Sequence, residues 1–583
     1  MSYKTPGVYV EEISIFPPSV AQVETAIPAF IGYTEKGPKE PTKITSLLEY
    51  EEHFGEAHPQ AFEVTLSDTE PYLPQSVSPS GGESPYLMHH ALRMFFGNGG
   101  GPCYIVSVGN YDTMPSLDDL GDYNELKGGL DKIRKVDEVT LIVIPEAIRL
   151  LSNEQYDLYK DVLMQCADLK DRFGIFDVRS EDTDGSGFRT GIGTSNLSYG
   201  AAYYPHLNTS IPYTYEDSGI TFTHSPTDAF EGLALDNVKT LSTVLDLQEQ
   251  FSDAKQAVED AETAGKAGVK DEKLRQITIA LSSADKAVTL VTNALDLVVD
   301  DTFTSTEYDD ATADYESVKS GTYNNSTSNG DLDQALDDLG TVVEDLETAM
   351  TDILAQVNTE TQIGSARNSN IADYFTNEFT IELNRLLGEL RITMPPSSTM
   401  AGIYAKVDED RGVWKSPANV SINQVSGPTE KLTMEENDDF NVHTTGKSIN
   451  VIRSFTGKGT LVWGARTLDG NSNEWRYLSV RRFFNMVEES VKKATEPFVF
   501  EPNDANTWVK VKAMIENFLV LQWRAGALMG SKPEQAFYVK VGLGETMTQQ
   551  DVLEGRMIVE IGMAVVRPAE FIILRFSHKM LES

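Results

Sequence analysis

The two ends of the chain constrain its fold more than any other part. Residues 5–13 read TPGVYVEEI and residues 568–577 read PAEFIILRFS, so a short apolar segment stands at each tip of a 583-residue chain. Chain ends are usually polar and frayed, and an uncovered apolar strand exposes both its side chains and its backbone hydrogen-bonding groups. Each segment therefore either folds back into its own core or completes a sheet in a neighbouring copy. The second alternative would make the protein a polymer.

Length and charge exclude several classes of protein. A chain of 583 residues is too long for a single hydrophobic core, so we expect about two to four domains. The net charge of −41 argues against nucleic-acid binding, which needs a basic surface. No apolar run approaches the roughly 18 residues of a membrane span, and no signal peptide is recognisable, so we expect no membrane insertion. Two cysteines in such a long chain argue against a disulfide scaffold and for a reducing compartment.

The N-terminal part alternates between helical and strand-like apolar patterns. Helical patterns fall at 86–97, 122–135 and 152–172, and strand-like runs fall at 103–108, 139–144 and 175–178. This alternation is typical of a parallel α/β layer. We therefore expect an α/β domain over residues 36–240, continued in 361–394, with residues 1–35 forming an N-terminal arm that joins the core.

Residues 241–360 differ from the rest in charge and in periodicity. They hold 26 acidic and seven basic residues, a net charge of −19, whereas residues 475–583 carry a net charge of +1. Apolar residues recur at alternating spacings of three and four, which is the pattern of a heptad seam. We interpret 241–360 as an inserted acidic helical bundle that faces outward. Its three seams are Phe251, Ala254, Val258, Ala261; Leu274, Ile277, Leu281, Ala284, Val288, Val291, Leu295, Val298; and Leu332, Ala335, Leu339, Val342, Leu346, Ala349, Ile353.

Residues 395–583 predict an α+β domain that closes the chain. Apolar faces at helical spacing occupy 480–491 and 508–522, and strands are expected at 536–541, 556–565 and 571–577. The fold class that follows is multidomain, α/β and α+β, with terminal strand arms and the acidic insertion.

Motifs for enzyme chemistry are absent from the sequence. The glycine cluster at 97–101 follows a helix and opens a strand, which is the reverse of the order in a phosphate cradle. The chain contains no Cys-x-x-Cys or His-Glu-x-x-His metal motif and no Gly-x-Ser-x-Gly nucleophile elbow. We therefore expect no enzyme activity, no catalytic residues, no metal and no cofactor. The alternatives are an enzyme that uses the α/β layer at 100–180 and a surface or adhesin structural protein.

Seven short motifs keep a characteristic order along the chain. Together they resemble the contractile tail sheath family of phages and contractile injection systems, although no single motif is decisive. The acidic segment 241–360 is not part of the shared pattern. The motifs are TPGVYVEE at 5–12, FFGNGG at 95–100, AGIY at 401–404, RGVWKSPAN at 411–419, VWGART at 462–467, YLSVRR at 477–482 and RPAEFI at 567–572.

This resemblance implies a structural subunit with a conserved core at 395–583. Such subunits polymerise as stacked hexameric rings in a helix around an inner tube and contract to drive the tube through a target envelope. The implied partners are further copies of the chain, the inner tube protein, baseplate and terminal cap proteins, and sister sheath proteins if the lattice is mixed. The implied location is a phage tail or phage tail-like particle assembled in the bacterial cytoplasm, with release from the cell left open.

The resemblance also assigns roles to the chain ends and to the C-terminal domain. Terminal strands of the family insert into neighbouring subunits, and here the strand arms are Val8, Tyr9, Val10, Phe571, Ile572, Ile573 and Leu574. We expect the near-neutral C-terminal domain to contact the tube, because a basic lining can hold an acidic tube reversibly. Ordinary solvated helix faces are the alternative for these cations. The candidates are Arg481, Arg482, Lys492, Lys493, Lys510 and Lys512.

Overall fold

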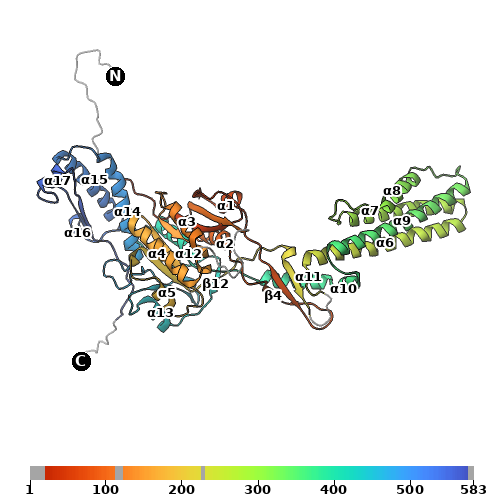
Figure 1. Ribbon diagram of the computed structural model, residues 1–583, viewed down its shortest axis with the longest axis horizontal. Helices are drawn as coiled ribbons and strands as arrows, with labels where there is room; N and C mark the ends of the chain where they lie inside the picture. The colour runs from red at the N-terminus through yellow and green to blue at the C-terminus, as the bar shows by residue number, and fades with distance from the viewer. Residues whose placement is uncertain (1–19, 112–122, 225–229, 575–583) are drawn as a thin grey trace, which may run out of the picture. The chain divides into compact units, whose positions relative to one another are not determined.

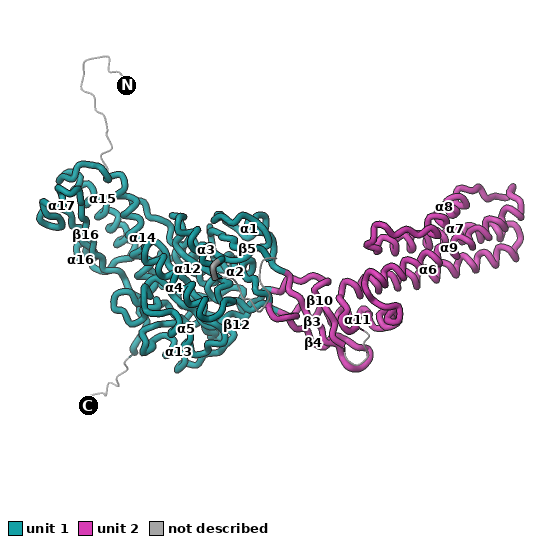
Figure 2. Tube along the Cα trace, in the orientation of Figure 1, with its two compact units in different colours: residues 1–58, 84–211, 391–583 teal, residues 59–83, 212–390 magenta. Residues whose placement is uncertain are grey.

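A computed structural model describes residues 20–111, 123–224 and 230–574 (Figure 1). It confirms a mixed α/β, multidomain architecture. The chain divides into two compact units, each built from segments that lie far apart in sequence (Figure 2). Unit 1 comprises residues 1–58, 84–211 and 391–583, and unit 2 comprises residues 59–83 and 212–390.

Unit 1 is built on an eight-stranded sheet in the order β14-β13-β8-β7-β6-β1-β5-β2. The six central strands run parallel, and the edge strands β2 and β14 run antiparallel to their neighbours. The strands are β1 (Pro28–Thr34), β2 (Thr42–Ile44), β5 (Cys103–Asn110), β6 (Leu141–Val143), β7 (Phe173–Asp177), β8 (Gly200–Tyr204), β13 (Ile449–Phe455) and β14 (Gly459–Val462). The parallel α/β layer expected from the sequence is present.

The sheet unites segments that the sequence had assigned to three separate parts. Strand β1, from the expected N-terminal arm, lies inside the sheet between β6 and β5, and all seven of its residues are buried. Strands β13 and β14 come from the expected C-terminal core and continue the same sheet through β8. The body of unit 1 therefore depends on pairings between distant parts of the chain.

Helices cover both faces of this sheet, so its strands are buried on two sides, as is usual for parallel strands. Side chains alternate along β1: Ile31 joins the cluster that includes α3 and α4, whereas Phe30 joins the cluster that includes α1, α2 and α12. The helices are α1 (Leu47–Phe54), α2 (Met88–Gly97), α3 (Tyr123–Ile133), α4 (Ser152–Leu169), α5 (Ser186–Gly191), α12 (Ser397–Arg411) and α13 (Met434–Asn441).

Two of the sequence motifs meet where α12 crosses α2. A Cβ at Gly402 would lie 2.4 Å from the carbonyl oxygen of Phe95, so only glycine permits this close approach. Unit 1 also contains a small antiparallel sheet, in which β11 and β12 both pair with β9. The strands are β9 (Leu207–Thr209), β11 (Thr393–Met394) and β12 (Val425–Pro428).

The C-terminal end of unit 1 is a helical layer with a two-stranded antiparallel sheet, β15–β16, and its own hydrophobic cluster. Val20 belongs to this cluster, which ties the first described residue to the last helices of the chain. The elements are α14 (Leu478–Thr495), η6 (Glu496–Phe498), α15 (Ala505–Arg524), α16 (Pro533–Ala536), β15 (Phe537–Lys540), α17 (Gln549–Leu553) and β16 (Glu560–Met563).

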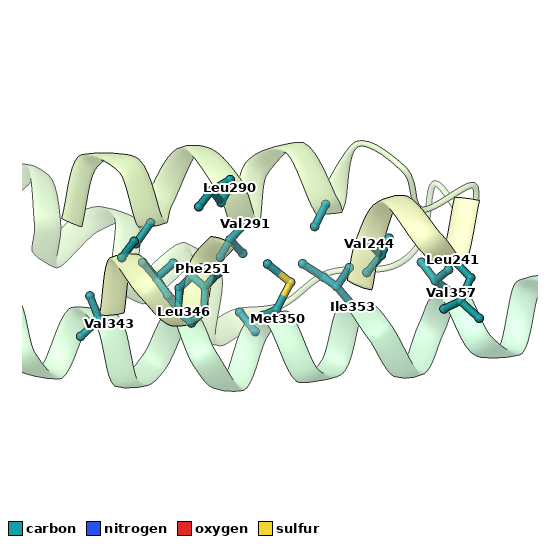
Figure 3. Packing of buried hydrophobic residues seen from close by; sticks show 14 of the residues in the cluster. Leu241, Val244, Phe251, Leu290, Val291, Val343, Leu346, Met350, Ile353 and Val357 are labelled. Carbon is teal, nitrogen blue, oxygen red and sulfur yellow. The ribbon is translucent and has the colours of Figure 1, made fainter. Parts of the chain in front are cut away.

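Unit 2 combines a three-stranded sheet, in the order β10-β3-β4, with six helices that share one hydrophobic cluster. Four of the helices pack side by side over several turns (Figure 1), and Figure 3 shows buried side chains between the longest of them from close by. The elements are β3 (Phe62–Leu66), β4 (Pro74–Pro79), β10 (Ile220–Thr223), α6 (Leu235–Ala267), α7 (Lys270–Leu295), α8 (Thr306–Lys319), α9 (Asn329–Glu360), α10 (Asn368–Tyr374) and α11 (Asn377–Glu389).

The heptad seams of α6 and α9 are buried as expected, but the buried face of α7 is rotated. On α7 the residues that the seam placed at the centre, Leu281 and Val288, are only half-buried. Small side chains take the central positions and let α7 lie close to α6 and α9. The packing energy gained by this close approach is therefore larger than the energy lost by leaving the larger side chains half-buried. The buried apolar residues of α7 are Ile277, Ala280, Ala284, Ala287, Leu290, Val291 and Ala294.

This packing predicts the effect of enlarging one alanine of α7. Ala287 is fully buried, so Ala287→Leu overpacks the helices and lowers the free energy of unfolding of unit 2 by about 1–3 kcal/mol. Urea unfolding followed by circular dichroism measures the change. The matched control is Lys286→Leu, which adds the same side chain at an exposed position of the same helix. Equal stability of the two variants would contradict the rotated face.

Candidate assembly interface

The C-terminal apolar segment finds no core in the described part of its own chain. Phe571, Ile572, Ile573 and Leu574 are between 68 and 78% exposed, and they form no strand. This excludes the first alternative, folding back, for these four residues. The arm residues Val8, Tyr9 and Val10 lie outside the described residues.

The segment leaves the folded body directly after a half-buried carboxylate, Glu570. Arg466 donates two hydrogen bonds to Glu570, from Nε at 2.9 Å and from Nη2 at 2.6 Å. Asn441 Nδ2 at 2.6 Å and the Tyr477 hydroxyl at 3.0 Å donate two more. The donors stand at the end of α13, after β14 and before α14, so three elements hold one carboxylate. We call this cluster the Glu570 anchor.

Burial makes the Glu570 anchor sensitive to the loss of either charge. Burial by itself raises the pKa of Glu570, but the hydrogen bonds from Arg466 and Asn441 outweigh it and hold the pKa below its ordinary value. The Arg466 side chain is 4% exposed. A guanidinium in that position is costly without an anion, since burial removes its water. The anchor therefore fixes the point at which the apolar segment begins.

The N-terminal segment is fastened to the same body at a second buried arginine, Arg482 of α14. Its guanidinium pairs with Asp408 of α12, at 2.5 and 3.0 Å, and also donates to the carbonyl oxygen of Thr25 at 3.0 Å. The Thr25 hydroxyl donates to the same Asp408 at 2.6 Å, and the Val23 amide donates to the Ser490 hydroxyl at 3.0 Å. We call this cluster the Arg482 junction.

The structure separates the six candidate tube-facing cations into two groups. Arg481 and Arg482 are each only 4% exposed, so they are not available to a tube surface in this conformation. Arg482 forms the junction just described. Arg481 donates to Asn485 Oδ1 at 2.8 Å, and its guanidinium lies 4.1 Å from the ring centre of Trp475. The two arginines of the YLSVRR motif therefore stabilise the fold of unit 1. The sequence pattern alone did not indicate this role.

The four lysines lie at the surface. Lys492 pairs with Glu489 at 3.0 Å, and Lys493 pairs with Asp137 at 2.7 Å. Lys510 is exposed and Lys512 is half-buried on α15, and neither forms an ion pair within residues 20–111, 123–224 and 230–574. These four cations remain candidates.

Sequence reasoning found the strands of the β15–β16 sheet but not its open edges. Among the described residues no third strand pairs alongside β15 and β16; the ladder is only extended by a bridge between Leu528 and Val565. Unpaired strand edges accept further strands readily. An apolar groove of about 320 Å³ runs between α14 and β16, lined by Phe484, Val487, Glu488, Val491, Lys492, Ile561 and Met563.

A larger groove brings together four of the sequence motifs. It has a volume of about 880 Å³, and its apolar lining includes Trp414, Met434, Trp463 and Tyr477. Phe571 and Ile572, the first residues after the Glu570 anchor, line it as well. We call it the tryptophan groove. One surface beside the root of the C-terminal segment is thus formed by four motifs that are spread over more than a hundred residues: RGVWKSPAN, VWGART, YLSVRR and RPAEFI.

Neither a metal site nor a membrane-spanning helix is found in the described ranges. No cluster of three His, Cys, Asp or Glu side chains there is arranged to hold a metal ion. No helix in the same ranges combines the length and the apolar character that a membrane crossing requires.

Comparisons with known proteins reveal which proteins this chain is similar to. Residues 471–579 match the family described as phage tail sheath C-terminal domain. The tail sheath protein of Vibrio phage KVP40 is 26% identical over 126 residues, which span 22% of this chain and 19% of that protein. The chain thus spans about a fifth of the length of this curated relative.

Solved structures extend the likeness to the whole chain. A chain of the anti-feeding prophage baseplate aligns with a TM-score of 0.51 and 25% identity, covering 99% of this chain and 100% of that chain. The anti-feeding prophage helical sheath in its contracted state gives a TM-score of 0.51 at 24% identity, with 99 and 100% covered. The resemblance to the contractile tail sheath family is therefore confirmed.

The Glu570 anchor predicts the effect of removing one charge. Glu570→Gln keeps the shape of the side chain but leaves Arg466 buried without an anion, which costs about 3–5 kcal/mol locally. We expect faster hydrogen exchange at Val566, whose amide donates to the Ala527 carbonyl at 3.0 Å next to the anchor. Glu545→Gln, an exposed carboxylate in the same region, is the control. Unchanged exchange at Val566 in Glu570→Gln would rule out the anchor.

The lowered pKa of Glu570 also predicts a pH dependence. Because the folded-state pKa lies below the ordinary glutamate value of about 4.3, the anchor contributes its full stability above that pH. The contribution is lost as the pH falls through the folded-state pKa. Unfolding measured between pH 3 and 7 should show a steeper acid-side loss for the natural chain than for Glu570→Gln. Parallel curves would contradict the role of Glu570.

Proposed function

We propose that this chain is the structural subunit of a contractile sheath. Copies polymerise as stacked hexameric rings in a helix around an inner tube, and contraction drives the tube through a target envelope. The observation that carries the proposal is a rigidly anchored root at Glu570 followed by four exposed apolar residues. It is supported by a fold that aligns with contractile sheath chains over 99% of its length.

In this proposal the open edges of the β15–β16 sheet accept the strand arms of neighbouring copies. One edge receives a segment with Val8, Tyr9 and Val10, and the other receives Phe571–Leu574. Each backbone hydrogen bond contributes about 0.5–1.5 kcal/mol, and each buried apolar side chain contributes about 1.5–3 kcal/mol. A two-stranded sheet is marginal alone, so added strands stabilise acceptor and donor together. Repetition along a lattice multiplies the gain.

Such a contact favours an open assembly. The donor segment and the acceptor edge are different surfaces of one chain, and a head-to-tail contact of this kind produces a helix when its rotation does not close. Anchors at Glu570 and Arg482 keep the arm roots fixed on the body while the arms themselves reorient. Contraction then draws on energy stored in the extended lattice, without a nucleotide.

The remaining surfaces receive roles by the same reasoning. Lys492, Lys493, Lys510 and Lys512 contact an acidic inner tube, and the acidic helical insertion at 241–360 faces outward, where its charge is solvated. In the lattice we assign a separate role to each of the four parts expected from the sequence, namely 1–35, 36–240 with 361–394, 241–360, and 395–583. Baseplate, cap and sister sheath proteins are further partners, and assembly takes place in the bacterial cytoplasm as part of a phage tail or tail-like particle.

The strand-arm proposal predicts a specific effect of one charge in the C-terminal segment. Ile573 is exposed in the isolated chain, so Ile573→Asp should leave unfolding unchanged. In an added strand the carboxylate would be buried, and we expect at least about a tenfold higher protein concentration for polymerisation with the tube protein. Ile573→Val is the matched control, and negative-stain microscopy and sedimentation are the readouts. Normal striated tubes from Ile573→Asp, or from a chain lacking residues 1–14, would refute strand exchange.

The helical insertion predicts tolerance to deletion. Asn237 Nδ2 donates to the Thr361 carbonyl at 3.3 Å, so α6 begins beside the end of α9. Val244 and Ile353 stand opposite each other near this end (Figure 3). Replacing residues 248–349 by a short glycine-serine linker should therefore leave tube formation intact and reduce the outer diameter of the sheath. Loss of polymerisation from a chain that remains folded would contradict a peripheral role.

A further inference from the structure

One aromatic side chain stands fully exposed at a strained backbone position. Phe500 is 102% exposed and has φ +73°, in the left-handed region that bulky residues avoid. Its neighbour Val499 is 62% exposed. Strain of this kind persists only where the surroundings enforce it, and it concentrates at functional positions. Large exposed aromatics are also the residues that most often anchor protein interfaces.

Hydrogen bonds hold the segment that carries Phe500 in place. It lies in the connector between α14 and α15, residues 496–504, which we call the Phe500 connector. Asn503 donates to the Arg556 carbonyl at 3.0 Å and accepts from Trp508 Nε1 at 2.7 Å. Asp504 caps α15 by accepting from the amides of Asn506 and Thr507. The connector is therefore preorganised, which lowers the entropy cost of an interface.

The Phe500 connector carries charge of one sign. Glu496, Glu501 and Asp504 are exposed, and residues 496–504 contain no lysine or arginine. An aromatic side chain with an acidic rim is complementary to an apolar recess with a basic rim.

The tryptophan groove of the same chain has those properties. Arg411, Lys415 and Arg567 line it, are exposed, and form no ion pair in the described part of the chain. Asp438 is the one unpaired acidic residue that the structure places in its lining, since Glu570 is neutralised by Arg466. Its Trp414 Nε1 is buried and without a partner among the described residues. At about 880 Å³ the groove is large enough for an aromatic ring and its flanking backbone.

We propose that the Phe500 connector of one copy docks into the tryptophan groove of another copy. The two surfaces share no residue, so the contact is head-to-tail and can propagate along an open helix. Phe571 and Ile572 line the groove, so docking there is coupled to the position of the C-terminal segment. The inference rests on the proposed polymerisation and adds a contact between folded bodies to the strand exchange.

Cross-linking between two cysteine variants tests the contact in the full chain. Cys103 and Cys166 are both buried, so introduced surface cysteines are the reactive ones. Mixed tubes of Glu501→Cys and Lys415→Cys chains, treated with a short bismaleimide, should give cross-linked dimers. Leu48→Cys, exposed on α1, replaces Glu501→Cys in the control and should give none. Normal tubes without a dimer above the control would overturn the docking but leave the sheath function standing.

Charge reversal provides a second measurement. Glu501→Lys and Lys415→Glu should each raise the concentration needed for polymerisation by about tenfold, and mixing the two variants should restore part of the loss. Phe500→Ser should act in the same direction without changing urea unfolding, because the side chain is exposed in the isolated chain. Unaffected polymerisation in all three variants would overturn the docking. If the natural chain forms neither tubes nor dimers with its tube partner, both the docking and the sheath function fail.

Discussion

A buried guanidinium must keep an anionic or carbonyl partner, and this constraint fixes both ends of the folded body. Arg482 is satisfied by Asp408 and by the carbonyl of Thr25, so the N-terminal segment is held where it meets α12 and α14. Arg466 is satisfied by Glu570, so the C-terminal segment leaves from a defined point. Breaking either ion pair would leave a buried positive charge without its counter-ion, which proteins seldom tolerate. The terminal segments thus start from fixed points on the folded body.

Unit 1 also carries surfaces that can accept another segment of chain. The β15–β16 sheet has open edges, α14 and β16 frame an apolar groove, and the tryptophan groove lies beside the Glu570 anchor. In the proposed lattice, the exposed C-terminal segment of one copy and the open edges and grooves of another copy complete each other. We infer that this is why motifs far apart in sequence, such as those around Trp414, Trp463 and Arg567, gather on one surface.

Patterns of local origin could be predicted from the sequence, and long-range pairings could not. The helices at α2, α4, α14 and α15 and the alternating strand at β16 follow from apolar spacing. The place of β1 inside the sheet does not, because a fully buried strand of seven residues carries no sign of its neighbours. Likewise, the heptad rule ranks Leu281 above Ala280, yet close helix contact reverses their burial. Basic residues suggested a tube surface at Arg481 and Arg482, but only tertiary contacts reveal that both are buried.

We propose that the C-terminal segment becomes ordered only in a neighbouring copy. Hydrogen exchange of residues 571–574, measured in the free chain and in tubes assembled with the inner tube protein, tests it most directly. We expect rapid exchange in the free chain, where these residues are exposed, and slowing by at least about a hundredfold in the tubes. Equally rapid exchange in well-formed tubes would contradict it.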